Sequence, residues 1–365
     1  MPGGGGAMRR RARRHGLVLV RALWIVMCAA LLAVSGVAWS TVSELEAGVE
    51  RSYAIAPDAP KSQNAVNILI MGLTTRLDLQ GQPLPDDLLQ RMRAGESDRG
   101  GYNANTLILL HIPRDGSAAV AMSVPRDNLV TLSGVPSGPQ TGKIKEAYGR
   151  AKELEERRLR SSGEDDARVL ERAGREAGRR AQVLTVSAFL NVPIDHLVEI
   201  SLVGFFHIAT KLGGVDVCLN RATRDDMSGA DFQAGPQQLN APQALSFVRQ
   251  RHGLANGDLD RTRRAQAFLA YLVSRLKSAD VVAVRALIDV AKEDVVLSDG
   301  LDLVGLAEHL PSEVRFHTLP VEGGAVVDGQ SVNRVDERRV QAAVSDLTAP
   351  AAVQPQPPPG IPCVD

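Results

Sequence analysis

The stretch QALSFVRQRHGLANGDLDRTRRAQAFLAYLVSRL, residues 243–276, has the pattern of two helices joined by a glycine-containing loop. Asn240 with Gln243 three residues later is a typical capping pair, and it predicts a helix that ends near Val248. Asp258 is a typical N-cap, so it predicts the start of a second helix. Along that helix, apolar residues recur at the spacing of a core-facing surface: Ala265, Phe268, Leu269, Leu272, Val273 and Leu276.

The same stretch places arginines on the core-facing side of the second helix, where an unpaired positive charge would be destabilising. Arg249 and Arg251 alternate, so their side chains point the same way if that segment is extended. Arg261 shares the face of the apolar stripe, and Arg264 lies at its edge. An inward-facing cation needs a partner, and one prediction is an anion held jointly by these four arginines, as guanidinium groups hold phosphates. The alternative partners are two nearby carboxylates, Asp258 and Asp260.

Further motifs precede this stretch. They are NILIMG at Asn67–Gly72 with Arg76 after it, NTLILLHI beginning at Asn105, SVPRD at Ser123–Asp127, KIKEAY at Lys143–Tyr148 and GFFHIATKLGGVDV at Gly204–Val217. The opening stretch adds AL-x-F-V-R-x-R and D-x-x-R-x-x-R-x-Q. In this order, the motifs together resemble the LytR–CpsA–Psr family of cell-wall enzymes over residues 64–277.

The resemblance implies a phosphotransferase that moves a glycopolymer from a polyprenyl-pyrophosphate carrier to peptidoglycan, usually with Mg²⁺. Cations must then neutralise the pyrophosphate, and the lipid requires an apolar cavity beside it. The residues that match the family's substrate-binding positions are Arg76, Arg126, Lys143, Arg249, Arg251, Arg261, Arg264 and Gln266. Arg126, Arg249 and Asp258 are the predicted catalytic residues, with Asp258 orienting or deprotonating the acceptor hydroxyl. A pyrophosphatase side reaction could accompany the transfer.

Three positions depart from the family pattern, and one of them is Ala265, which stands where a glutamine is often found and leaves only Gln266. Thr74 and Asn105 stand where the family usually has metal-binding aspartates, so they are the predicted metal-side residues although they carry no formal charge. Mg²⁺ prefers carboxylates and phosphates, which leaves the metal dependence open. The carboxylates that could compensate are Asp78, Asp98, Asp127 and Asp258.

Several of these residues also have purely structural interpretations. Arg126 and Asp127 could form an ion pair that stabilises a turn. Lys143 could be a surface lysine, and Gln266 could be a polar flank of its helix. His252 beside Arg251 suggests acid–base chemistry, but the sequence identifies no nucleophile that would pair with it.

The composition excludes some functional classes. The 365-residue chain has 42 basic and 42 acidic residues, so it lacks the basic excess of a nucleic-acid-binding protein. Aromatic residues make up only 4% of the chain, which removes the usual base-stacking surfaces. We therefore expect no nucleic-acid partner.

The N-terminal residues have the pattern of a signal anchor. Five arginines between Arg9 and Arg14 precede an apolar run from Leu17 to Trp39, and residues 22–40 carry no charge. This length suits one membrane-spanning helix, with the N-terminus in the cytoplasm by the positive-inside rule. A cleaved signal peptide is the alternative. The expected protein is a single-pass protein of the cell membrane whose main domain is extracytoplasmic.

Short apolar runs alternate with helical segments, which predicts an α-β-α sandwich around a central mixed β-sheet, preceded by one transmembrane helix. The expected strands are Asn67–Met71, Thr106–Ile112, Ala119–Val124, Leu197–Leu202 and Val215–Leu219. A helix over Leu202–Leu212 is expected to stop at Gly213. The charged segment Gly149–Arg180 predicts a pair of solvated helices.

The expected organisation has five parts. They are a cytoplasmic basic tail (1–16), a transmembrane helix (17–40), an extracytoplasmic stalk (41–63), a catalytic domain (64–320, motif core 67–277) and a C-terminal extension with a Pro-rich tail (321–365). Cys28 lies in the expected membrane span. In an oxidising compartment, Cys218 and Cys363 predict a disulfide that pins the tail to the domain; two free thiols are the alternative.

Three functional hypotheses remain. The first is the glycopolymer–peptidoglycan phosphotransferase. The second is a catalytically degenerate homologue that binds polyprenyl (pyro)phosphate without turnover, which Thr74 and Asn105 favour. The third is a membrane-anchored regulator of transcription, which the N-terminal arginines oppose because they place the domain outside the cytoplasm.

Overall fold

The computed structural model describes residues 48–96, 101–278, 287, 289–290, 292–302, 306, 311, 313–349 and 363–365. The chain divides into two units, Met1–Gly48 and Val49–Asp365, and the second is the folded domain. The expected basic tail, the expected transmembrane helix and Cys28 lie outside the described residues. Within the described residues, no helix has the length and apolarity needed to cross a bilayer.

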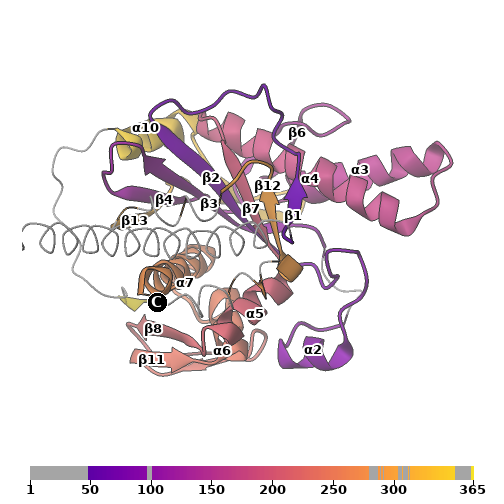
Figure 1. Ribbon diagram of the computed structural model, residues 1–365. Coiled ribbons are helices and arrows are strands. Elements are labelled where there is room, and N and C mark those ends of the chain that lie inside the picture. Colours follow the sequence, from indigo (N-terminus) through magenta and orange to yellow (C-terminus); the bar gives the residue numbers. More distant parts are fainter. Residues whose placement is uncertain are drawn as a thin grey trace, which may run out of the picture. The chain divides into compact units, whose positions relative to one another are not determined.

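A seven-stranded mixed sheet forms the centre of the domain, in the order β1-β12-β7-β2-β3-β4-β13 (Figure 1). Its strands are β1 (Glu50–Ser52), β2 (Ala65–Leu73), β3 (Ala104–Pro113), β4 (Ala119–Ser123), β7 (His196–Ile200), β12 (Val295–Ser298) and β13 (Val314–Thr318). β2 pairs antiparallel with β3 and parallel with β7, and β3 pairs antiparallel with β4. The carboxyl ends of β2, β4 and β7 therefore lie at one edge, beside the start of β3.

Both faces of the sheet are covered, as the alternation of side chains along β2 requires. Ile68 lies in one apolar core, while Leu69 and Met71 lie in the other. The Leu69 face packs against α3 (Glu146–Ser161), α4 (Ala167–Leu190) and α10 (Glu337–Thr348). The Ile68 face packs against α2 (Asp86–Arg91), α5 (Leu202–Lys211), α6 (Ala241–Arg249) and α7 (Asp258–Ser278). Figure 1 shows α3, α4 and α10 on one side of the sheet and α5, α6 and α7 on the other, which confirms the mixed α/β fold with a central mixed sheet.

The expected strands are all present, with ends shifted by at most two residues. Val215–Leu219 forms β8 of a separate three-stranded sheet, with β11 (Gly235–Leu239) and β16 (Cys363–Val364). The remaining two-stranded sheets are β5 (Leu129–Leu132) with β6 (Gln140–Lys143), β9 (Thr223–Asp225) with β10 (Ala230–Phe232), and β14 (Gly323–Val327) with β15 (Gln330–Arg334). The sequence did not predict β1, β12 and β13, which complete the central sheet.

Two expected peripheral segments contribute to the domain. β1 comes from the expected stalk, and it pairs with β12 at the edge of the central sheet. α10 comes from the expected C-terminal extension, and its Val340 and Val344 belong to the same core cluster as Phe189 of α4. The contacts that place these segments in the domain are made with residues far away in the chain.

The prediction of two solvated helices over Gly149–Arg180 is wrong for α4. Arg175 and Arg179 of α4 are each 1% exposed. The Glu199 carboxylate on β7 accepts hydrogen bonds from Arg179 Nε at 2.9 Å and from Arg179 Nη2 at 3.1 Å. The many charges of this segment suggested contact with solvent. In the fold, Arg179 is instead paired with Glu199, a residue of another element that the local sequence does not reveal.

The two helix starts expected near Asn240 and Asp258 are largely as predicted. Asn240 and Gln243 form a full capping box at the start of α6, which ends at Arg249. Asp258 is the first residue of α7 rather than its N-cap, and its carboxylate pairs with arginines instead. Salt bridges therefore compete with the capping role at this position.

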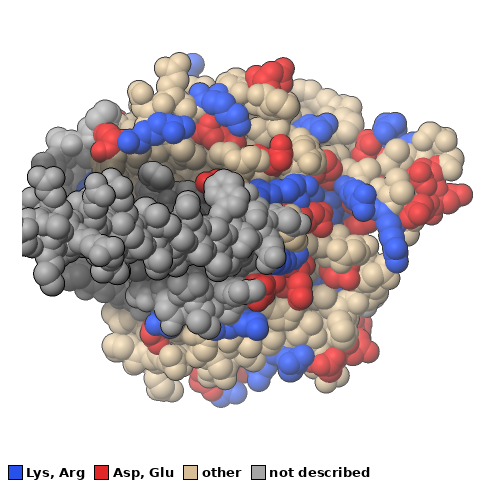
Figure 2. Space-filling model, viewed as in Figure 1, with Lys and Arg blue, Asp and Glu red and all other residues tan. Residues whose placement is uncertain are grey.

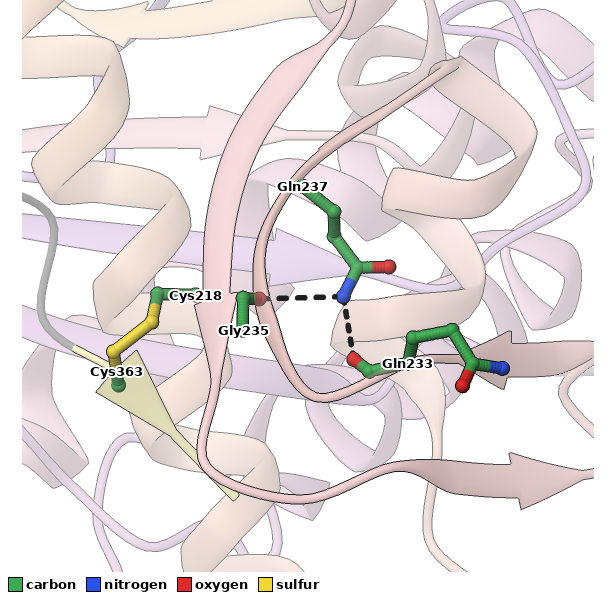
Figure 3. The surroundings of a disulfide bond; sticks show 5 residues. All are labelled: Cys218, Gln233, Gly235, Gln237 and Cys363. Atoms are coloured by element: carbon green, nitrogen blue, oxygen red, sulfur yellow. Dashed lines mark hydrogen bonds between the residues drawn. A yellow bond between two sulfur atoms is a disulfide. The ribbon is translucent and has the colours of Figure 1, made fainter.

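Cys218 of β8 and Cys363 of β16 form the predicted disulfide (Figure 3). The two cysteines are also register partners in the parallel β8–β16 pair. Arg264 Nε donates to the carbonyl oxygen of Asp365 at 2.8 Å, so the chain end also contacts α7. The C-terminal residues are thus held to the domain by a covalent bond, a strand pair and a side chain.

Loss of this disulfide is expected to destabilise the domain by about 2–4 kcal/mol, because the bond restricts a long loop of the unfolded chain. The sequence separation of the two cysteines is 145 residues. Urea denaturation of the Cys363→Ser protein would measure the free energy of unfolding. Reductant should lower the stability of the wild type by a similar amount and leave the variant unchanged. A wild type that tolerates full reduction without loss would contradict this expectation.

Candidate active site

A cavity of about 430 Å³ lies at the edge of the sheet where β2, β4 and β7 end. Helices α5, α6 and α7 supply the opposite wall. The volume is within the usual range for small-ligand sites. The apolar part of the lining consists of Ile70, Ile108, Ile200, Leu202, Phe205, Leu245, Val248, Ala265, Phe268, Leu269 and Leu272. Open α/β sheets commonly place ligands at this edge.

Five arginines line the same cavity, whereas Asp225 is the single carboxylate among its described lining residues. The arginines are Arg76, Arg126, Arg249, Arg251 and Arg261. They come from the loop after β2, the turn after β4, the end of α6 with the segment that follows, and the first turn of α7. Leu272, in the apolar part, is about 16 Å further along α7 than Arg261. A charged end and an apolar part therefore follow one another along this helix.

Arg249 holds its charge in the cavity wall without a carboxylate partner among the described residues. Its Nη1 donates to the carbonyl oxygens of Met92 and Arg93, each at 3.1 Å. Burial lowers the pKa of Arg249 to about 10, and repulsion from Arg76 and Arg251 acts in the same direction. An incoming anion would stabilise a guanidinium in this setting. The salt-bridge alternative considered from the sequence therefore does not account for this arginine.

Asp258 bridges two of the other arginines. Its Oδ1 lies 3.0 Å from Arg126 Nε and 3.0 Å from Arg261 Nη2, so the salt-bridge alternative holds for Arg261. Arg126 Nε also lies 3.5 Å from Asp127 Oδ2, which is the ion pair expected for the turn. Burial lowers the pKa of Arg261 to about 9, with repulsion from Arg126 adding to the effect and attraction by Asp258 opposing it. Both carboxylate oxygens of Asp258 are shielded from solvent and lie between the two guanidinium groups, while its expected action on an acceptor hydroxyl stays a prediction.

Acidic and basic side chains are interspersed on the face shown in Figure 2, and this face offers no broad basic patch among the described residues. The concentration of arginines is instead a property of the cavity wall. Field lines from charges in such a low-dielectric wall are focused into the cavity, which favours an anionic ligand there.

The sequence as a whole matches a known protein family. A model of the LytR_cpsA_psr family matches residues 37–349. The chain belongs to this family. It is 31% identical to the cell wall biosynthesis protein LcpA of Corynebacterium glutamicum, over 96% of this chain and 69% of that protein. It is 24% identical to the polyisoprenyl-teichoic acid–peptidoglycan teichoic acid transferase TagV of Bacillus subtilis, over 84% of this chain and 71% of that protein.

Solved structures of LytR_cpsA_psr proteins show the same fold. The crystal structure of B. subtilis TagV superposes with a TM-score of 0.54 at 20% identity, and the match covers 80% of this chain and 100% of that one. The structure of TagT bound to LI-WTA superposes with a TM-score of 0.52 at 19% identity, over 82% of this chain and 95% of that one. At these identities the likeness establishes the fold alone.

The two metal-side positions of this LytR_cpsA_psr protein contact each other. Asn105 Nδ2 donates to Thr74 Oγ1 at 2.7 Å, and Arg126 Nη1 donates to Asn105 Oδ1 at 2.6 Å. The amide oxygen that Asn105 could offer to a cation therefore already faces a guanidinium. Mg²⁺ prefers carboxylate oxygens, and the described part of the chain contains no group of three or more His, Cys, Asp or Glu residues suited to a metal. These residues do not fit a bound Mg²⁺.

Three of the four carboxylates expected to compensate are described by the structure, and these three do not line the cavity. Asp78 accepts hydrogen bonds from backbone N–H groups of its own loop. Asp127 Oδ1 lies 2.5 Å from Lys145 Nζ, and this contact and the charge of Arg126 lower the pKa of Asp127 although burial acts to raise it. Asp258 is occupied by arginines, and Asp98 lies outside the described residues. Asp78, Asp127 and Asp258 therefore do not offer a carboxylate to a metal ion in the cavity.

Arg264 was predicted to bind pyrophosphate, but it does not line the cavity. Its side chain is fully buried, and its guanidinium donates to Gln250 Oε1 at 2.6 Å and to the carbonyl oxygen of Phe247 at 3.3 Å. It also holds Asp365 at the C-terminus. Arg264 lies at the edge of the apolar stripe, so its side chain points towards α6 and the C-terminus. There it connects α7 to these two segments.

Gln266 and Lys143, the other two predicted substrate residues outside the cavity lining, also have structural contacts. Gln266 Nε2 donates to Ser123 Oγ at 2.8 Å and to the carbonyl oxygen of His317 at 3.0 Å, which ties α7 to β4 and β13. Lys143 Nζ lies 3.9 Å from Asp127 Oδ1. Neither residue is a simple surface group, since the Lys143 side chain is 13% exposed and Gln266 is 8% exposed; their described contacts are with other parts of the domain.

Two lining residues, Asp225 and His252, were not among the predicted site residues. His252 Nδ1 lies 3.4 Å from Asp225 Oδ1. The sequence identified no nucleophile that His252 would pair with, and the structure places it beside a carboxylate instead. Asp225 ends β9 and belongs to none of the recognised motifs, so the sequence contains no local signal of this contact.

Proposed function

We propose that this chain is a membrane-anchored phosphotransferase that moves a glycopolymer from a polyprenyl-pyrophosphate carrier to peptidoglycan. The cavity carries this proposal, because its apolar lining along α7 continues from an end with five guanidinium groups. A polyprenyl pyrophosphate has the same two parts, an isoprenoid chain and a polyanion. The names of TagV of B. subtilis and TagU of Enterococcus faecalis, both polyisoprenyl-teichoic acid–peptidoglycan teichoic acid transferases, support the assignment.

The arginines divide into two groups with different roles in this proposal. Arg76, Arg249 and Arg251 bind the pyrophosphate, and Arg249 gains a counter-charge that no carboxylate among the described residues provides. Arg126 and Arg261, held by Asp258, stabilise the charge that develops as the phosphoryl group is transferred. These donors are in place before the substrate binds, so little reorganisation is needed. With water in place of the wall sugar, the same site would hydrolyse the carrier as a pyrophosphatase.

The same proposal places the domain outside the cytoplasm, beside the membrane that contains the lipid carrier. The Cys218–Cys363 disulfide supports this location, because disulfides are rare in reducing compartments. The arginines before the apolar run Leu17–Trp39 support a cytoplasmic N-terminus. A reporter fused to the C-terminus would test the topology, and cytoplasmic activity of the reporter would contradict it.

The test of the function is the release of polyprenyl phosphate from a polyprenyl-pyrophosphate-linked saccharide by the full-length protein in detergent, with a peptidoglycan fragment as acceptor. Transfer of the saccharide phosphate to the fragment is the expected result. Binding of the donor without release, across acceptors and metal ions, would replace the transferase by a degenerate binding homologue. The contact between Thr74, Asn105 and Arg126 favours that second function. A protein that does not bind the donor at all would refute both.

Removal of divalent cations is expected to change the affinity for polyprenyl pyrophosphate by less than about twofold, because the residues at the metal-side positions do not suit Mg²⁺. Calorimetric titration in EDTA and in Mg²⁺ would measure this. The Thr74→Asp/Asn105→Asp variant is the matched control, since two carboxylates in these positions should make the affinity depend on Mg²⁺. A wild type that loses binding in EDTA would show that a metal is required after all.

A further inference from the structure

Transfer to a hydroxyl requires a proton acceptor, and the cavity offers few. Guanidinium groups do not accept a proton in proteins. Asp258 lies between Arg126 and Arg261, with both of its carboxylate oxygens shielded. Among the described residues that line the cavity, Asp225 and His252 are the remaining side chains that can take up a proton.

Asp225 is built into the protein as a fixed anion. Its side chain is buried, and its carboxylate accepts hydrogen bonds from Ser228 Oγ at 2.8 Å, from Met227 N at 3.0 Å and from Arg251 N at 3.3 Å. Burial alone would raise the pKa of Asp225, but these hydrogen bonds outweigh it and lower the pKa. A carboxylate stabilised in its charged form is a weak base, and it is well suited to orient a neighbouring imidazole.

The imidazole of His252 lies beside this carboxylate. Its Nδ1 lies 3.4 Å from Asp225 Oδ1, and its side chain is 70% exposed. A proton on Nδ1 that faces Asp225 leaves the lone pair of Nε2 free to accept another proton. The exposed position also suits the reaction, because a wall sugar arrives from solvent whereas the lipid occupies the apolar lining.

We propose that His252 is the general base of this site and that Asp225 positions it; the inference rests on the proposed phosphotransfer. The acceptor hydroxyl oxygen forms a bond to the phosphorus of the sugar-linked phosphate, and its proton passes to His252 Nε2. The bond between that phosphorus and the bridging oxygen breaks, and polyprenyl phosphate leaves with the electron pair. The exposed imidazolium then returns its proton to solvent.

The test compares His252→Ala and His252→Gln with the wild type as full-length proteins. The kcat for release of polyprenyl phosphate is expected to fall by about 10²–10⁴-fold, the usual contribution of a general base. Affinity for polyprenyl pyrophosphate, titrated separately, should change by less than about threefold, because a base acts in the transition state rather than in donor binding. Added imidazole should restore part of the kcat of His252→Ala and none of that of His252→Gln. A structural role of His252 would not produce this rescue.

Asp225→Asn tests the positioning role. Its kcat should also fall while donor affinity is retained, and adding His252→Gln to it should cause little further loss, because the two residues act as a unit. Thermal unfolding of each variant checks that the β9–β10 turn survives the change. If Asp225→Asn does not fold, the two His252 variants still decide the proposal.

The matched control is His207→Gln. His207 also pairs with an aspartate, with Nδ1 2.7 Å from Asp294 Oδ2, but it does not line the cavity. The kcat of the His207→Gln protein should remain that of the wild type. A His252→Gln protein with wild-type kcat would overturn the assignment while the proposed function stands. A wild type that neither binds nor turns over the donor would overturn the proposed function, and this inference with it.

Discussion

Replacement of Arg249 by alanine is expected to lower kcat/KM for polyprenyl phosphate release by about 10²–10³-fold, the loss typical of one preorganised charge-stabilising donor. The free energy of unfolding is expected to stay the same or to rise. The loss of turnover and the unchanged stability have the same cause. Arg249 has no carboxylate partner among the described residues, and burial lowers its pKa to about 10. Alanine removes a desolvated cation that two backbone carbonyl oxygens, but no carboxylate among the described residues, stabilise. Turnover and urea unfolding would be measured on the same preparations.

Two further variants make this result specific. Arg249→Lys keeps the charge but loses the planar fork, so an intermediate loss of turnover is expected. Arg91→Ala is the matched control, because Arg91 pairs with Asp87 at 3.2 Å on the exposed surface of α2 and such pairs contribute little. Wild-type turnover in Arg249→Ala would exclude this guanidinium from the pyrophosphate site. A large loss of stability would instead make it a structural residue.

Replacement of Glu199 by alanine is expected to lower the free energy of unfolding by about 3–5 kcal/mol, the usual effect of removing one partner of a buried ion pair. Glu199 is 1% exposed and pairs with Arg179 Nε at 2.9 Å. Burial acts to lower the pKa of Arg179, but the Glu199 charge more than offsets this and the pKa is raised. Without Glu199, two buried arginines of α4 lose a carboxylate that they share. Urea denaturation would measure the change.

The control for Glu199 is Glu153→Ala. Glu153 pairs with Arg157 at 3.3 Å on the exposed side of α3, so its loss should cost less than about 1 kcal/mol. The double variant Glu199→Leu/Arg179→Met should recover part of the stability, because no unpaired charge remains at that pair. A loss below about 1 kcal/mol in Glu199→Ala would show that water or another side chain compensates the arginines.

The sequence predicted much of the cavity because its arginines belong to contiguous motifs. Arg249, Arg251 and Arg261 were placed by helix caps and periodicity within one stretch, and they do line one cavity. Arg264 was assigned to the same site by its motif, yet the fold turns it towards Gln250 and the C-terminus. Periodicity gives the direction of a side chain around its own helix, but not what the neighbouring element presents to it.

The remaining part of the site depends on pairings between distant segments. Asn105 contacts Thr74 because β2 and β3 are antiparallel neighbours with Gly72 opposite Thr106. His252 meets Asp225 because β9 lies beside the segment after α6. Such contacts follow from sheet register and loop packing, for which a single sequence carries no local signal.

The family, the α/β class, the helix that starts at Asn240 and the arginine-rich stretch could be predicted from sequence, because caps, periodicities and motif spacings are properties of neighbouring residues. The Cys218–Cys363 pair could also be predicted, because these are the two cysteines left outside the expected membrane span. Which arginines face the cavity and which charges are paired could be seen only in the folded domain. Burial makes an unpaired charge costly, and whether a charge is buried and paired depends on elements that come together only in the folded chain.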